Sequence, residues 1–239
     1  MGTEPRSGPV EQTDRVHVRT LGVVDTLRWS WEALTDRLEL VGFVFLVALI
    51  TVVANLGVSP ATAGETPEFA SWVWPLYLVY FLAVTVVWSV AYTSAADAVA
   101  NRKRPLRDHV VAAAKRVPAL VAVAIPTWIL FVVGLLLFVL PGIYVLHRLV
   151  LAFPACVIDR KGPLASLKAG WRAGGGNVLK LVGVSLVYFA LIGVSNYVAG
   201  IFGPLTVVGG LISAGLSAVL LPLFGLALGH LYLESSRNQ

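Results

Sequence analysis

The sequence predicts an all-α protein, a polytopic transmembrane helix bundle without a separate soluble domain. Apolar residues make up 57% of the 239 residues and charged residues only 13%, so charged side chains are too few to cover a soluble domain of this length. Six long apolar stretches hold most of the chain, and the Lys and Arg residues gather in alternate connections between them. Together these features predict a multi-pass protein of a prokaryotic cell membrane.

The N-terminal part of the chain is polar. Residues 1–23 are predicted to form a disordered cytoplasmic segment, and no cleavable signal peptide is apparent in them. A regular pattern follows, in which apolar residues recur at steps of three and four: Val24, Leu27, Trp31, Leu34 and Leu38. This spacing places them on one face of an amphipathic helix, which we expect to lie on the cytoplasmic membrane surface.

One transmembrane domain is predicted over residues 24–234, followed by a short cytoplasmic tail at 235–239. Its six candidate spans lie near 40–58, 73–96, 118–140, 143–158, 178–199 and 205–233. They are continuously apolar and therefore helical, because the strands of membrane barrels alternate in polarity. At ~1.5 Å per residue, five stretches are long enough to cross a bilayer, while the 16 residues of 143–158 reach only about 24 Å.

The basic residues indicate the orientation of these spans. Lys and Arg are abundant in three segments and absent from the connections between them; the basic segments are 1–38, 97–117 and 158–180. By the positive-inside rule these segments and both termini are cytoplasmic. If 143–158 did not cross, the basic 158–177 loop would be left outside. Charge therefore favours six spans, although a re-entrant 143–158 stays open.

An internal repeat agrees with this count. Asn101-Arg102-Lys103-Arg104-Pro105-Leu106 aligns without gaps with Asp159-Arg160-Lys161-Gly162-Pro163-Leu164, at an offset of 58 residues. Each motif precedes a short helical stretch and then a long apolar span, and the first span has a similar, weaker lead-in. The predicted unit is a cytoplasmic amphipathic helix followed by a hairpin of two spans, repeated three times. Because each unit starts in the cytoplasm, a symmetry axis would run along the membrane normal.

Motifs that carry catalysis are missing from the sequence. It contains no phosphate-binding loop, no His-Glu-x-x-His and no Gly-x-Ser-x-Gly. The four histidines are scattered, and Cys156 is the only cysteine, so neither a disulfide within the chain nor a cysteine-based metal site is expected. We therefore expect no enzymatic activity, no cofactor and no bound metal. The Gly174–Gly176 run is interpreted as a flexible stop between a surface helix and the next span.

Arg148, beside His147, is the most informative polar residue. A charge at mid-bilayer costs on the order of 3 kcal/mol and usually faces protein or water. One interpretation is that Arg148 extends its side chain to the outer headgroups. The other is an anion or headgroup contact inside the bundle. Weaker candidates for an intramembrane polar contact are Asp97, Asn196, Asn55 and His230.

The basic connections are expected to contact anionic lipid headgroups on the cytoplasmic face. The candidate residues are Arg102, Lys103, Arg104, Arg107, Arg160 and Lys161. A homo-oligomer or a membrane protein partner is also possible, whereas nucleic acid is not expected, because the basic residues lie between membrane spans. Small residues four apart, in the pairs Gly225 with Gly229 and Ser213 with Ser217, predict close helix contacts.

One part of the chain resembles a known family. The residues that carry the resemblance are Leu140-Pro141-Gly142-Ile143-Tyr144, His147-Arg148-Leu149, Pro154, Asp159, Gly162, Leu167 and Trp171. They resemble the membrane domain attached to some bacterial glycerophosphodiester phosphodiesterases and related stand-alone prokaryotic membrane proteins of unknown function. Two positions depart from that pattern: Asp159 stands where Glu is usual, and the Gly174–Gly176 run replaces a Thr-Arg-Gly-like segment. The phosphodiesterase catalytic domain is absent, so the resemblance implies a fold and not that activity.

These observations lead to a ranked set of functional hypotheses. The first is a non-enzymatic membrane scaffold or a regulator of lipid or envelope processes. The alternative is a small-solute or lipid transporter with a polar intramembrane site near Arg148. An enzyme acting on lipid headgroups comes third, because clusters of carboxylates and histidines are missing from the sequence.

Overall fold

The computed structural model describes residues 18–59, 66–203 and 205–238. These residues form ten helices and one short strand pair, and no other strand. The elements are α1 (Val23–Thr35), α2 (Leu38–Asn55), β1 (Val58–Ser59), β2 (Glu68–Phe69), α3 (Val73–Val99), α4 (Leu106–Ala114), α5 (Val117–Leu137), α6 (Val139–Leu149), α7 (Ala152–Ile158), α8 (Pro163–Gly175), α9 (Val178–Ile201) and α10 (Val207–Arg237).

Six segments of the described chain are helical, long and apolar enough to cross a membrane. They are α2, α3, α5, α6 together with α7, α9 and α10. The all-α prediction and the six apolar helices are therefore confirmed, and the chain has the character of a multi-pass membrane protein. The fourth segment is interrupted, because a turn at Val150 and Leu151 separates α6 from α7.

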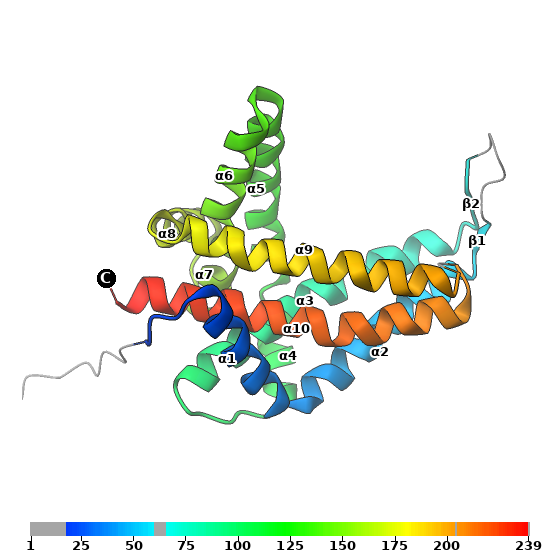
Figure 1. Ribbon diagram of the computed structural model, residues 1–239, viewed down its shortest axis with the longest axis horizontal. Coiled ribbons are helices and arrows are strands. Elements are labelled where there is room, and N and C mark those ends of the chain that lie inside the picture. The colour runs from blue at the N-terminus through cyan, green and yellow to red at the C-terminus, as the bar shows by residue number, and fades with distance from the viewer. Residues whose placement is uncertain (1–17, 60–65, 204, 239) are drawn as a thin grey trace, which may run out of the picture.

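Four long helices, α2, α3, α9 and α10, run along the long axis of the molecule (Figure 1). The last of them, α10, packs against the other three and also against α1, α7 and α8. Its C-terminal half is buried almost without interruption from Pro222 to Ser235. This helix is therefore the central element of the core. The antiparallel β1–β2 pair lies at the far end of these helices (Figure 1).

Small residues bring α10 close to its neighbours. Gly225 faces Ala91 of α3, and a Cβ on Gly229 would lie 2.6 Å from the Cβ of Ala95, as the spacing of the two glycines predicts. The serine pair does not play the same role. Ser213 and Ser217 are only half-buried, and the residues that meet α2 are instead Gly210, Ala214 and Ala218.

The α5–α6 hairpin leaves this group near one end and runs across its direction (Figure 1). The two helices of the hairpin pack mainly against each other. In addition, α5 contacts α7, α8 and α3, and α6 contacts α8 and α9. The sequence predicted these spans alongside the others and placed the turn at 141–142. The chain instead turns at Phe138, which is extended at φ −170° and ψ 148°. Pro141 is then the third residue of α6, where a missing N–H costs little.

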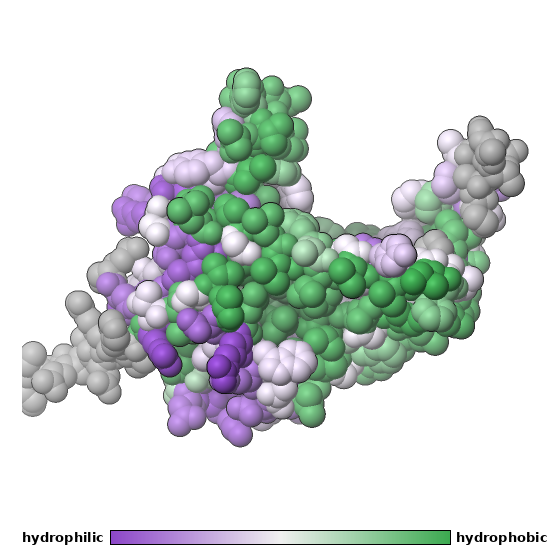
Figure 2. Space-filling model, viewed as in Figure 1, coloured by the Kyte–Doolittle hydropathy of each residue, from purple (hydrophilic) through white to green (hydrophobic). Residues whose placement is uncertain are grey.

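The polar side chains gather at the end of the molecule formed by α1, α4, α8 and the end of α10 (Figure 2). We call this the polar end. Pro163 is the first residue of α8, a position for which proline is preorganised, whereas Pro105 is the N-cap residue just before α4.

The last residues of the predicted disordered segment are ordered. Residues 1–17 of the predicted disordered segment lie outside the described residues, but Val18 and Leu21 are buried against the end of α10. The backbone N–H of Val18 donates to the side-chain oxygen of Asn238 at 3.1 Å, and the side-chain NH₂ of Asn238 donates to the Val18 carbonyl at 2.6 Å. The predicted tail also differs, since α10 continues through Arg237.

Candidate functional site

Three polar clusters and a basic cavity make up the polar end, and the first cluster surrounds Asp97. Its side chain is fully buried near the end of α3. Arg104 donates from Nε to Asp97 Oδ2 at 2.7 Å, and Arg102 Nε lies 3.7 Å from Oδ1. Both arginines come from the connection after α3, where Asn101 has a left-handed backbone with φ 48°. The connection therefore folds back and neutralises the carboxylate.

His109 of α4 joins the same cluster and is almost completely buried. Its Nε2 lies 3.2 Å from Asp97 Oδ2 and 3.3 Å from Arg37 Nη1. Its Nδ1 lies 2.7 Å from the hydroxyl of Thr93. Burial lowers the pKa of His109; Asp97 opposes this shift, and the charges of Arg104 and Arg37 reinforce it. The Thr93 hydroxyl donates to backbone carbonyls of α3, so the neutral ring donates to it from Nδ1. Its Nε2 then accepts from Arg37 and has no proton for Asp97.

The second cluster fastens the connection after α7 to the end of α10. Lys161 and the Tyr232 hydroxyl donate to Asp159 Oδ2 at 2.5 and 2.6 Å, respectively. Arg237 donates to Oδ1 at 2.8 Å. Burial alone would raise the pKa of Asp159, but the hydrogen bonds from Lys161 and Tyr232 and the charge of Arg237 outweigh it, and the pKa lies below its ordinary value.

The third cluster joins α9, α10 and the segment before α1. Lys180 donates to Glu234 Oε1 at 2.5 Å, and the backbone N–H of Leu21 donates to Oε2 at 3.2 Å. Asn177, the N-cap residue of α9, donates to the Ser235 hydroxyl at 2.7 Å. These contacts give the buried Glu234 both a charged and a neutral partner, as a buried carboxylate requires.

A cavity of 610 Å³ opens at the polar end between α3, α4 and α7. We call it the basic pocket. Five cationic side chains and one carboxylate line it: Arg104, Arg107, Lys115, Arg116, Arg160 and Asp108. Its remaining lining is Thr93 and the apolar residues Val111, Ala112, Val157 and Ile158. The pocket therefore combines a strong positive charge with an apolar wall.

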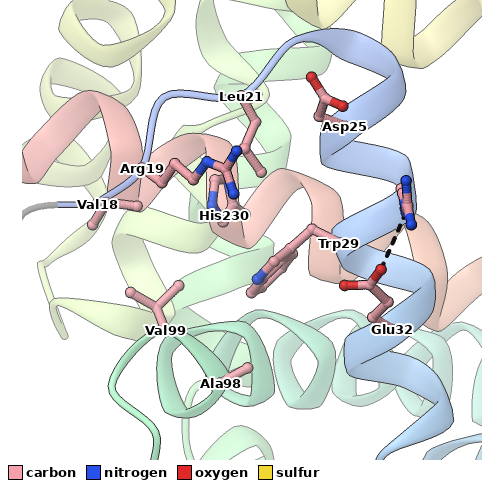
Figure 3. Close-up of a pocket in the computed structure, with 10 residues that line it drawn as sticks. Val18, Arg19, Leu21, Asp25, Trp29, Glu32, Ala98, Val99 and His230 are labelled. Carbon is pink, nitrogen blue, oxygen red and sulfur yellow. Dashed lines mark hydrogen bonds and ion pairs between the residues drawn. The ribbon is translucent and has the colours of Figure 1, made fainter.

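A second cavity, of 560 Å³, lies beside α1. Figure 3 shows Trp29 reaching from α1 toward His230 of α10, and the two rings are 4.5 Å apart. Here acidic and basic residues balance: Asp25 and Glu32 accompany Arg19 and Arg28, and Arg28 donates to Glu32 at 3.2 Å. This cavity has no preference for one sign of charge.

Arg148 is half-buried among aromatic rings. Its guanidinium lies 4.5 Å from the ring centroid of Trp171 and 5.6 Å from that of Tyr144. Its buried Nε has no hydrogen-bond partner among the described residues. The glycine run explains how α8 approaches it: a Cβ on Gly174 would lie 2.9 Å from Arg148 Cα, and one on Gly175 would meet the guanidinium. Gly174 and Gly175 are the last residues of α8 and Gly176 is its C-cap, so the helix ends at this run as predicted, and the first two glycines also pack against Arg148.

The four candidates for an intramembrane contact do not converge. His147 contacts the Ile143 carbonyl and, at 3.1 Å, the Ser185 hydroxyl. Asp97 belongs to its own cluster, and Asn196 is exposed on α9. Of the weaker candidates, Asn55 accepts a hydrogen bond from Tyr77, and His230 packs against Trp29 with the two rings tilted by 51°.

The six candidate lipid-binding residues divide into groups. Arg104, Arg107 and Arg160 line the basic pocket, and Lys161 is bound to Asp159. Arg102 and Lys103 are exposed on the connection after α3. Sequence reasoning missed Lys115 and Arg116 as members of the pocket. Their position in the basic 97–117 connection was the one sequence feature that could have indicated them. Only the fold brings that connection beside Arg160.

The fold and its polar end define a class: a helical, multi-pass membrane protein with a basic surface at one end. Comparison with known proteins adds no narrower assignment, because no family model matches the chain and no curated protein or solved structure is similar to it. The resemblance of residues 140–171 to a membrane domain therefore stays an expectation. No three His, Cys, Asp or Glu side chains within the described residues are grouped to hold a metal ion.

Proposed function

We propose that this chain is a non-enzymatic component of a prokaryotic cell membrane, a scaffold or regulator of lipid or envelope processes whose polar end faces the cytoplasm. The gathering of the basic connections at one end, where Figure 2 shows the hydrophilic residues, carries this proposal. Cytoplasmic membrane surfaces are negatively charged, and each Lys or Arg near them adds about 1 kcal/mol of attraction. The resemblance to a membrane domain that occurs beside other proteins supports the same role.

The proposed topology has α2, α3, α9 and α10 crossing the membrane, with both termini in the cytoplasm. The α5–α6 hairpin enters the membrane from the polar end and returns to it, so the connections before and after it stay on one side. Because the hairpin runs across the four helices, it would lie along the plane of the membrane in the cytoplasmic leaflet, without crossing (Figure 1). Its apolar tip supports the same placement, since Leu136, Leu137 and Phe138 are 82%, 72% and 72% exposed within the chain. Such a surface is stable in hydrocarbon.

The transporter alternative requires a polar interior around Arg148. The aromatic contacts of this arginine and the separation of the other candidates give it no support. We therefore place the scaffold or regulator first.

Reconstitution separates the two functions. We expect the protein in phosphatidylcholine vesicles to unfold at a lower temperature than in vesicles that also contain phosphatidylglycerol, because the polar end gains anionic contacts. Neither preparation should release encapsulated ions or a small fluorescent solute faster than empty vesicles do. Protein-dependent release would transfer the assignment to a transporter, and equal stability in both lipids would remove the role of anionic lipid.

A further inference from the structure

We propose that the basic pocket is a specific binding site for a phosphate group, carried either by an anionic lipid headgroup or by a soluble phosphate compound. This inference rests on the proposed function, because a cytoplasmic polar end places the mouth of the pocket at the cytoplasmic membrane surface. It goes further than the proposed function, because it assigns phosphate binding to one defined cavity and not to a general attraction between basic residues and the membrane.

Charge is the first argument for the site. Arg107, Lys115, Arg116 and Arg160 have no carboxylate within ion-pair distance among the described residues, whereas Lys161 and Lys180 are each bound to one. Asp108 is the one acidic side chain in the lining. Four cations without such partners around one cavity produce a local field that only an anion can balance.

The fixed position of Arg104 is the second argument. Its Nε donates to the buried Asp97 at 2.7 Å, which orients the guanidinium. Its terminal amino groups donate to no described residue. An arginine held in this way offers a planar pair of donors that suits two phosphate oxygens at once.

The shape and the apolar wall indicate the rest of the ligand. The cavity of 610 Å³ lies within the range of about 300–1,000 Å³ that is usual for ligand sites. Val111 and Ala112 of α4 face the pocket together with Val157 and Ile158 of α7. A wall of this kind suits the glycerol and the first acyl carbons of a lipid, so a lipid phosphate fits the lining better than free phosphate.

Arg160 provides an unusually clean test. Its backbone is left-handed, with φ 52°, a conformation that glycine adopts without strain and arginine does not. Arg160→Gly therefore removes a pocket cation without disturbing the fold. Lys103→Gln is the matched control, because it removes one exposed charge from the same basic surface outside the pocket.

The experiment uses the full chain in nanodiscs of phosphatidylcholine, with phosphatidic acid added as the probe, and measures bound lipid by native mass spectrometry. We expect Arg160→Gly and Arg107→Gln each to weaken phosphatidic acid binding about fivefold, and the double variant about twenty-fold. Lys103→Gln should change it less than about twofold, because Lys103 lies outside the pocket and its exposed charge is screened by solvent and salt. Thermal unfolding of every variant without anionic lipid verifies folding.

Inorganic phosphate, titrated in phosphatidylcholine nanodiscs, distinguishes the two sources. Protection by phosphate alone, lost in Arg160→Gly, would assign the site to a soluble phosphate compound. A requirement for phosphatidic acid assigns it to lipid. Equal losses in Lys103→Gln and Arg160→Gly would overturn the specific site and leave the basic surface intact. Absence of any preference for anionic lipid in the unmodified protein would overturn the proposed function, and it would overturn this inference as well if inorganic phosphate gave no protection either.

Discussion

At the scale of residues, the buried carboxylate of Asp97 and the half-buried carboxylate of Asp159 organise the polar end. Each binds a cation from the connection that follows it: Asp97 binds Arg104, and Asp159 binds Lys161. Both cations belong to the repeated motif, Arg104 at its fourth position and Lys161 at its third. The sequence did predict a polar role for Asp97 and a basic role for Arg104. It could not predict Arg37 and Thr93 as neighbours of His109, because these contacts depend on how α2, α3 and α4 pack together.

His109 should make stability depend on pH. Its pKa in the folded protein lies below the ordinary value of 6.5, so the unfolded chain takes up a proton first as the pH falls. The stability that the neutral ring contributes is therefore complete above about pH 6.5 and decreases below it. We expect His109→Gln to flatten the fall in unfolding temperature between neutral and mildly acidic pH. Parallel curves for the variant and the unmodified protein would contradict this account of His109.

Arg148 should act through its aromatic neighbours. A partly desolvated cation–π contact contributes roughly 1 kcal/mol, so we expect Trp171→Leu to lower the free energy of unfolding by about that amount. The same change should have little effect once Arg148 is replaced by Leu, because the contact is already absent. Trp128→Leu, at an exposed tryptophan of α5, is the control for the loss of an indole. Additive effects of the Arg148 and Trp171 substitutions would mean that the two side chains do not interact.

At the scale of elements, the continuous apolar stretches predicted every long helix and placed most ends within a few residues. The hairpin between α5 and α6 is the exception, both in its turn and in its direction. Pro141 and Gly142 suggested a break, yet Gly142 is buried against Gly134 and Leu135, so this glycine serves close packing between the two helices. Hydropathy measures how apolar a helix is and carries no information on its direction.

A cysteine at the hairpin tip tests whether the hairpin crosses. Leu140 is 73% exposed within the chain, and a re-entrant hairpin keeps this position in hydrocarbon. A thiol there stays protonated and reacts slowly, because the thiolate is the nucleophile. We expect Leu140→Cys, in a Cys156→Ala background, to resist an impermeant maleimide added to intact cells. Labelling as strong as that of Ser71→Cys would instead establish six full crossings.

At the scale of the whole molecule, the basic residues collect at one end because the chain returns there after each pair of long helices. The sequence predicted this division of charge from Lys and Arg counts alone. It did not predict the basic pocket, since Arg107 and Arg160 are separated in the sequence by α5, α6 and α7 and meet only in the folded chain. The binding of Val18 to Asn238 was likewise hidden, because neither residue belongs to a recognisable pattern.

The side of the membrane on which the polar end lies is the most direct test of the proposed function, and the structure indicates which positions to label. Ser166 is buried, but its neighbour Ala165 on α8 is exposed, as is Ser71 at the opposite end. Single cysteines at Ala165 and Ser71, in the Cys156→Ala background, are treated with an impermeant maleimide in intact and in permeabilised cells. A cytoplasmic polar end predicts that Ser71→Cys is labelled in both, and Ala165→Cys only after permeabilisation. Labelling of Ala165→Cys in intact cells, with Ser71→Cys protected, would contradict the orientation on which the proposed function and the phosphate site depend.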